Sequence, residues 1–211
     1  MPGKRDLPTT TSYAILGLLA AGPCSAYDLA QRMRIGYGFF WPRARSHVFT
    51  EVKKIARLGW ADGTERTRGA RRRVDYHITP DGRAALEAWL ASEPQTFSLE
   101  AEHLVRVYLA GFGRTTDLED VLRDARARGE QMLAIAGSVI ADYEAGLVEG
   151  PQDEPHLRVV LVDFLSQFAR LTVDWADRSL ADLADGDHLD DTARRARAVE
   201  RLRHLPHTRP G

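Results

Sequence analysis

Apolar residues recur at helical spacing in three short blocks near the start of the chain. The pattern predicts helices over residues 13–21, 26–34 and 46–58. A glycine follows each block, as is common after the last turn of a helix. Hydroxyl side chains precede each block and can accept hydrogen bonds from the free N–H groups of a first turn. The candidate caps are Thr10, Thr11 or Ser12 for the first helix, Ser25 for the second and Ser46 for the third.

The third block has two chemically different sides. At 100° per residue, Val48, Val52 and Ile55 gather on one side, which we expect to pack inward. The other side is a stripe of basic and hydrogen-bonding residues, suited to phosphates and base edges or, if nothing binds it, to solvent. The members of this stripe are Ser46, His47, Thr50, Lys53, Lys54 and Arg57.

Two β-like runs follow, over residues 60–65 and 72–78, and Gly69 between them permits a tight turn. This segment predicts a hairpin with an arginine-rich tip. Because like charges so close together repel one another, the tip is expected to meet a polyanion, the alternative being a solvated loop. The tip arginines are Arg66, Arg68, Arg71, Arg72 and Arg73.

A fourth helix is predicted over residues 83–90, with Thr79 as its cap and Pro80 near its start. Three helices, a two-stranded hairpin and a further helix form the order of a winged helix-turn-helix domain. The polar stretch 92–98 then separates this DNA-binding domain, residues 1–92, from the rest of the chain.

Everything after this boundary is expected to be helical. Helices are predicted over about 99–111 and 118–147, and a third carries a wide apolar stripe from Leu157 to Trp175. A long helical hairpin with broad apolar faces normally needs a cover, so residues 99–185 are expected to form an all-α domain that dimerises and binds an effector. The Arg-rich tail, residues 186–211, is expected to hold one more helix at 190–204 and to be partly disordered.

The charge of the chain changes sign between these parts. The formal net charge is −1 over 211 residues, but residues 1–92 hold 15 Lys and Arg against 8 Asp and Glu, while the remainder holds 14 against 22. The N-terminal part alone is therefore suited to a polyanion.

Other classes of protein find little support in the sequence. The single cysteine, Cys24, allows no internal disulfide and is expected to be structural or incidental, in a reducing compartment. The longest apolar run, residues 13–21, falls short of the roughly 18 residues of a membrane span. The first residues lack the pattern of a secretory signal, so we expect no membrane association and a cytoplasmic location.

Motifs of catalysis and metal binding are absent from the sequence. HExxH, CxxC, GxSxG and Walker A patterns do not occur, and the seven histidines are scattered. His103 beside Glu102 and His156 near Glu154 lack the helical partner that a metal site needs. We therefore expect neither an enzyme nor a metal or other cofactor.

The first ninety residues resemble the PadR family of bacterial transcriptional regulators. The resemblance rests on the order and spacing of several segments: residues 13–19, Gly22-Pro23, Ala26-Tyr27-Asp28-Leu29, Phe40-Trp41, residues 48–59, the Arg- and Gly-rich hairpin, and Tyr76-His-Ile-Thr-Pro-Asp-Gly-Arg83. The later helices are similar in pattern to the C-terminal domain of longer members. Two steps depart from the family, since Val48-Phe49-Thr50 replaces an Ile-Tyr-Pro-like step and Gly69-Ala70-Arg71 replaces a Gly-Arg-Pro-like turn.

If the third helix enters the major groove of double-stranded DNA, its polar stripe and the hairpin arginines are the expected contacts. Tyr27 and Arg43 or Arg45 are secondary candidates for phosphate contact. A dimer would place two such helices about one helical turn apart, which predicts a pseudo-palindromic operator.

The resemblance also implies a repressor that a small lipophilic or aromatic molecule releases. The candidate effector contacts are Trp89, Phe112, Phe164, Phe168 and Trp175, although aromatic residues at helical spacing are more often plain core. The alternative function is a protein-interaction adaptor that uses the acidic helical part and binds no specific DNA. Salt-sensitive DNA binding distinguishes the two.

Overall fold

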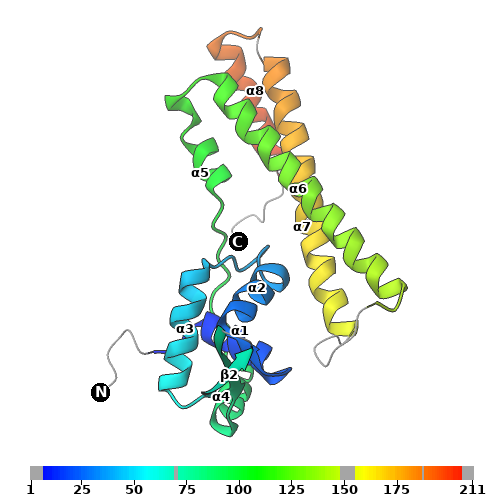
Figure 1. The fold of residues 1–211 in the computed structure, drawn as a ribbon. Coiled ribbons are helices and arrows are strands. Elements are labelled where there is room, and N and C mark those ends of the chain that lie inside the picture. The colour runs from blue at the N-terminus through cyan, green and yellow to red at the C-terminus, as the bar shows by residue number, and fades with distance from the viewer. Residues whose placement is uncertain (1–6, 69–70, 148–154, 187, 206–211) are drawn as a thin grey trace. The chain divides into compact units, whose positions relative to one another are not determined.

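The chain folds into two compact units, with the division between Phe97 and Ser98. The structure is a computed structural model, and it describes residues 7–68, 71–147, 155–186 and 188–205. Both units are built mainly from helices (Figure 1).

The described part of the N-terminal unit has the predicted winged helix-turn-helix order. Three helices are followed by a hairpin and a fourth helix, and a very short strand lies between the first two helices. The helices are α1 (Thr10–Ala20), α2 (Ala26–Gly36), α3 (Arg45–Arg57) and α4 (Pro80–Leu90), and the strands are β1 (Cys24–Ser25), β2 (Ala61–Arg68) and β3 (Arg71–Ile78).

The three strands form one antiparallel sheet in the order β1-β3-β2. The sequence did not predict β1, because two residues carry no measurable alternation. Cys24 pairs with Tyr76 and Ser25 with Asp75, so β1 extends the hairpin by a third strand. Cys24 is buried there, and burial raises the pKa of its thiol, which agrees with a structural role.

The core of this unit lies between α1, α2 and α3. Ile15 and Leu16 of α1, Leu29 of α2, and Val52 and Ile55 of α3 are fully buried. These positions are the apolar sides that helical spacing predicts, and their burial is the main stabilising contribution of the unit. Helix α4 joins the core through a stack of aromatic rings, Tyr13 on Trp89 with 4.8 Å between ring centres.

Several helix ends differ from the predicted ones. The cap of α1 is Thr9, whose hydroxyl accepts from the Ser12 backbone N–H, one residue before the predicted candidates. Helix α3 begins at Arg45, and Ala44 precedes it without a side-chain cap, so the prediction that Ser46 caps it is wrong. The caps Ser25 and Thr79 are confirmed, and Thr79 starts α4 at Pro80, three residues earlier than predicted.

The C-terminal unit consists of helices and their connections throughout its described residues. The two long helices α6 and α7 run side by side (Figure 1). Small residues of both helices, Ala125, Ala169 and Ala176, are buried. The elements are α5 (Glu102–Tyr108), the short 3-10 helix η1 (Ala110–Phe112), α6 (Thr115–Glu144), α7 (Pro155–Gly186) and α8 (Asp191–Arg203).

The described residues contain no candidate for a membrane span or for a metal site. Within these ranges, no helix is both long enough and apolar enough to cross a membrane. Among the same residues, no three or more His, Cys, Asp or Glu side chains are arranged to hold a metal ion.

Candidate nucleic-acid interface

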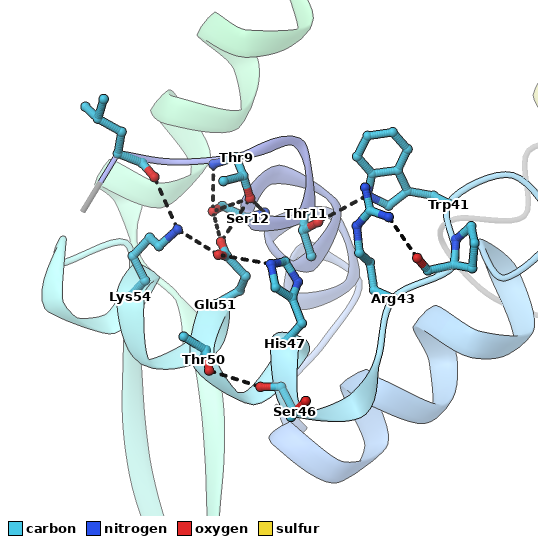
Figure 2. Close-up of polar contacts among 12 residues, drawn as sticks. Thr9, Thr11, Ser12, Trp41, Arg43, Ser46, His47, Thr50, Glu51 and Lys54 are labelled. Atoms are coloured by element: carbon cyan, nitrogen blue, oxygen red, sulfur yellow. Dashed lines mark hydrogen bonds and ion pairs between the residues drawn. The ribbon is translucent and has the colours of Figure 1, made fainter. Parts of the chain in front are cut away.

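Helix α3 presents a row of polar and basic side chains to solvent. Ser46, Thr50, Lys53 and Arg57, which we call the α3 row, are exposed and are spaced by three or four residues, so they follow one face of the helix. The side chain of His47 flanks the row and is 44% exposed. The Thr50 hydroxyl donates a hydrogen bond of 3.0 Å to the Ser46 carbonyl oxygen (Figure 2). The α3 row and His47 are the part of the predicted stripe that a ligand can reach.

Lys54 does not belong to the exposed stripe, and its predicted place there is wrong. Its side chain is buried, and its Nζ donates to Glu51 Oε1 at 2.6 Å and to the Leu7 carbonyl oxygen at 3.2 Å. The segment before α1 lies against this side of α3 (Figure 2). The helical spacing used for the prediction treats α3 as an isolated helix, so it does not include the segment around Leu7 that covers Lys54. The ammonium group is therefore committed to an internal ion pair.

Glu51 is the acidic partner of this pair and is only 2% exposed. Its carboxylate also accepts hydrogen bonds from the hydroxyls of Ser12 at 2.5 Å and Thr9 at 3.0 Å (Figure 2). Burial by itself would raise the pKa of Glu51, but the hydrogen bonds from Lys54, Ser12 and Thr9 outweigh it and hold that pKa below its ordinary value. Sequence reasoning missed Glu51, although an acid three residues before a lysine in a helix is a recognisable ion-pair signal.

Two arginines, Arg43 in the turn before α3 and Arg45 at the first position of α3, lie over aromatic rings. The guanidinium carbon of Arg43 lies 4.2 Å from the centre of the Trp41 ring, and that of Arg45 lies 4.7 Å from the centre of the Tyr27 ring. Trp41 is fixed in turn by a hydrogen bond of 3.1 Å from its Nε1 to Thr11 Oγ1 (Figure 2). An arginine ordered by such stacking loses less entropy when it binds a phosphate.

The hairpin of β2 and β3, which we call the wing, contains its own counter-charges. Arg66 Nε lies 3.7 Å from Asp75 Oδ2, and Arg73 Nε donates to Asp75 Oδ1 at 3.0 Å. Arg73 also pairs with Asp28 in the first turn of α2. Two carboxylates therefore already offset part of the repulsion among the wing arginines. Contact between the wing and a polyanion stays a prediction. The side chains of Arg68, Arg71 and Arg72, and the turn at Gly69 and Ala70, lie outside the described residues.

Comparisons with known proteins give sequence and fold similarity to transcriptional regulators. No protein-family model matches the chain. The negative transcriptional regulator PadR of Bacillus subtilis is 26% identical over 124 residues, which are 58% of this chain and 68% of PadR.

Solved structures of bacterial proteins have the same fold. Bacillus subtilis PadR in complex with operator DNA has a TM-score of 0.66 at 21% identity, over 83% of this chain and 99% of that chain. The same PadR with p-coumaric acid has a TM-score of 0.62 at 22% identity, over the same shares of the two chains. The protein smu.1604c of Streptococcus mutans has 0.70 at 18% identity over 81% and 98% of the two chains, and the Vibrio cholerae virulence activator AphA has 0.61 at 18% over 83% and 99%.

The chain is similar in sequence to Bacillus subtilis PadR and in fold to PadR-family transcriptional regulators. The predicted resemblance is thereby confirmed, and so is the mainly helical fold with its small antiparallel sheet. In this PadR-like chain the α3 row and the wing occupy the recognition-helix and wing positions of a winged helix-turn-helix.

The C-terminal unit of the PadR-like chain contains an apolar pocket of about 360 Å³. Helices α5, α6 and α7 form it, and two of the five predicted effector contacts, Phe168 and Trp175, line it. The few polar side chains in the lining include His103, Arg128 and Arg178. A mostly apolar wall with a few polar groups is the usual composition of a small-molecule site.

The other three predicted effector contacts lie elsewhere. Phe164 stacks on Phe168, with 6.5 Å between ring centres, but is not among the residues that line this pocket. Phe112 is 93% exposed on η1. Trp89 packs on Tyr13 within the N-terminal unit. The structure thus brings two of the five aromatic residues together at one pocket.

Proposed function

We propose that the protein is a sequence-specific DNA-binding transcriptional regulator that reads its operator with α3 and the wing. The observation that carries the proposal is the exposed α3 row on the recognition helix of a winged helix-turn-helix fold. Its relative PadR, which has the same fold, has been solved with operator DNA.

In the proposed complex α3 lies in the major groove. Lys53 and Arg57 contact phosphates or guanine, because cationic side chains make the strongest contacts with both. Ser46, His47 and Thr50 are short enough to hydrogen-bond base edges at the groove floor. Discrimination between sequences is therefore assigned to the first half of α3.

The flanks of α3 supply the contacts that fix its position on the duplex. Arg43 and Arg45, ordered on Trp41 and Tyr27, reach phosphates near the start of α3. The wing arginines lie along the neighbouring minor groove, where the negative potential is strongest when the groove is narrow. These contacts are independent of sequence and give the binding its salt dependence.

The C-terminal unit is proposed to form a homodimer. Helix α7 exposes Leu157, Val160, Phe164 and Leu171, which follow a seven-residue pattern along one face. An apolar face of this length is stable in water only when another surface covers it. Two copies related by a two-fold axis would read the two halves of a pseudo-palindromic operator.

Repression is the proposed regulatory outcome, and a small lipophilic or aromatic molecule is the proposed signal that releases it. PadR is a negative regulator and has been solved with p-coumaric acid. The pocket lined by Phe168 and Trp175 is the proposed site of such a molecule. Its occupation would favour a dimer whose recognition helices no longer match the operator spacing.

Titration of the purified protein with DNA from its own upstream region, followed by fluorescence anisotropy at two salt concentrations, tests this function. We expect binding that survives an excess of unrelated DNA and weakens as salt rises. Lys53→Ala and Arg57→Ala should each weaken binding to every sequence and lower the salt slope by about 1.

Arg195→Ala in α8 provides the control, since it also removes one positive charge, from an exposed helix position of the other unit. Equal binding to the upstream and unrelated fragments, with no effect of the two α3 variants, would contradict the proposal. It would favour the adaptor that uses the acidic helical part.

A further inference from the structure

The DNA-facing side of α3 is backed by a buried polar network as well as by apolar packing. Glu51 directly follows Thr50 of the α3 row but points inward, where it is almost fully buried. His47, on the exposed face one turn earlier, has its Nε2 3.9 Å from Glu51 Oε1 (Figure 2). The network therefore extends from the proposed base-reading residues into the interior of the domain.

The network ends at the first turn of α1. Thr9 and Ser12 form a capping box there, in which each side chain accepts a hydrogen bond from the other residue's backbone N–H. The same two hydroxyls donate their own hydrogens to Glu51 Oε2. Each hydroxyl thus accepts from α1 and donates to α3, so the cap of one helix also fixes the position of the other.

The charges in this contact are balanced. The positive end of the α1 dipole and the Lys54 ammonium group both favour an anion where the Glu51 carboxylate lies. Lys54 also donates to the Leu7 carbonyl oxygen, which holds the segment before α1 against the same side of α3. A charge with so many directional partners has one favourable position, unlike an apolar side chain that tolerates sliding and rotation.

We infer that Glu51 is a positioning residue of the DNA interface, which fixes the rotation of α3 about its axis through Thr9, Ser12 and Lys54. The inference rests on the proposed function and adds a residue that does not itself touch DNA. Rotation of α3 would displace the short base-reading side chains Ser46 and Thr50 from the groove floor. The long, flexible Lys53 and Arg57 would still reach phosphates.

This difference gives the inference its own signature in binding measurements. A variant that frees α3 to rotate loses affinity for the operator but keeps its affinity for unrelated DNA, and its salt slope is unchanged. A variant that removes a phosphate contact weakens both kinds of binding and lowers the slope. A variant that merely unfolds loses both in proportion to its unfolded fraction.

The test compares Glu51→Gln and Ser12→Ala with Lys53→Ala, by anisotropy titration of the full chain on operator and unrelated DNA. Circular dichroism first sets a temperature at which every variant is folded. We expect Glu51→Gln to lose operator affinity by about tenfold, the scale of one lost base contact, with binding to unrelated DNA held within about twofold. Ser12→Ala should show the same pattern to a smaller degree, and it carries the test if Glu51→Gln fails to fold.

Two results would overturn the inference in folded protein: unchanged operator binding by both variants, or equal weakening on operator and unrelated DNA. Failure of the wild-type chain to bind any DNA would instead overturn the proposed function. In that case amide hydrogen exchange, which needs no DNA, tests whether Glu51 fixes the position of α3. Faster exchange in the first turn of α1 and in α3 of Glu51→Gln, but not of Lys53→Ala, supports the positioning role, and unchanged exchange rejects it.

Discussion

Glu51 is the residue whose ionisation links the interface to the stability of the domain. Its hydrogen-bonded carboxylate has a lower pKa in the folded chain than in the unfolded chain. A group of this kind stabilises the folded state above its unfolded pKa, and the contribution is lost as the pH falls through the folded value. The buried Lys54 ammonium group in turn needs the Glu51 carboxylate as its counter-charge.

We predict that Glu51→Gln lowers the free energy of unfolding at pH 7 by about 3 kcal/mol, because Lys54 is then left as a buried cation without its carboxylate. The difference in unfolding free energy between Glu51→Gln and wild type should become smaller below pH 4.5, the ordinary pKa of a glutamate. Below that pH the ionised Glu51 carboxylate stabilises the wild-type fold progressively less. Urea unfolding at neutral and acidic pH measures both differences. The same difference at both pH values would show that the ionisation of Glu51 contributes nothing.

At Asp75 a second single substitution probes the wing. The Asp75 carboxylate pairs with both Arg66 and Arg73. Asp75→Asn removes this negative charge, so both arginines should become available to DNA phosphates. We expect tighter binding to unrelated DNA and a salt slope steeper by about 1. The free energy of unfolding should change little, since these arginine side chains are exposed and water screens their ion pairs.

Asp62→Asn is the matched control for the wing, because Asp62 is an exposed acid of β2 with the same change in charge. If Asp75→Asn and Asp62→Asn bind DNA equally, the pairing of Arg66 and Arg73 with Asp75 does not weaken DNA binding by the wing. The anisotropy titration described above measures both variants.

At the scale of the helices, α6 and α7 pack closely at Gly129. A Cβ atom added there would lie 2.7 Å from Val173 Cγ2 and 3.0 Å from the Ala169 carbonyl oxygen. One of these neighbours is backbone, so it cannot move without displacing α7. Gly129 is therefore a requirement of helix packing, whereas Gly137 in the same helix has open space around its Cα.

We predict opposite effects of alanine at these two glycines. Gly129→Ala should destabilise the unit by about 1–3 kcal/mol, because overpacking outweighs the better helix propensity of alanine. Gly137→Ala should be neutral or stabilising by up to about 1 kcal/mol. Thermal unfolding followed by circular dichroism measures both. A stabilised Gly129→Ala would show that α6 and α7 separate easily, contrary to the packing described.

At the scale of the whole molecule, the exposed apolar face of α7 bears on the proposed dimer and on operator binding. Val160 is 70% exposed and belongs to the seven-residue pattern that the proposed dimer covers. Val160→Glu should shift the protein toward monomer in sedimentation equilibrium and weaken operator binding, because a monomer reads only half a site. Arg170→Glu, on an exposed polar side of the same helix, should leave the assembly unchanged. A dimer that persists in Val160→Glu would place the interface on another surface.

The sequence by itself determined the order of the elements, the hairpin, the long helices and most of the α3 row. These features depend on local periodicity and on glycine and proline signals, which act within a few residues. Thr79 and Ser25 were predicted as caps for the same reason, since a cap contacts its own helix.

The tertiary structure alone decided which residues are withdrawn from the surface and which come together. Lys54 is buried because the segment at Leu7 and Thr9, more than forty residues away, covers one side of α3. Strand β1 exists only because β3 pairs with it, and Phe168 and Trp175 meet the residues of α5 and α6 only after α7 packs. Each of these features depends on contacts between distant segments, which the period of a single helix or strand does not encode.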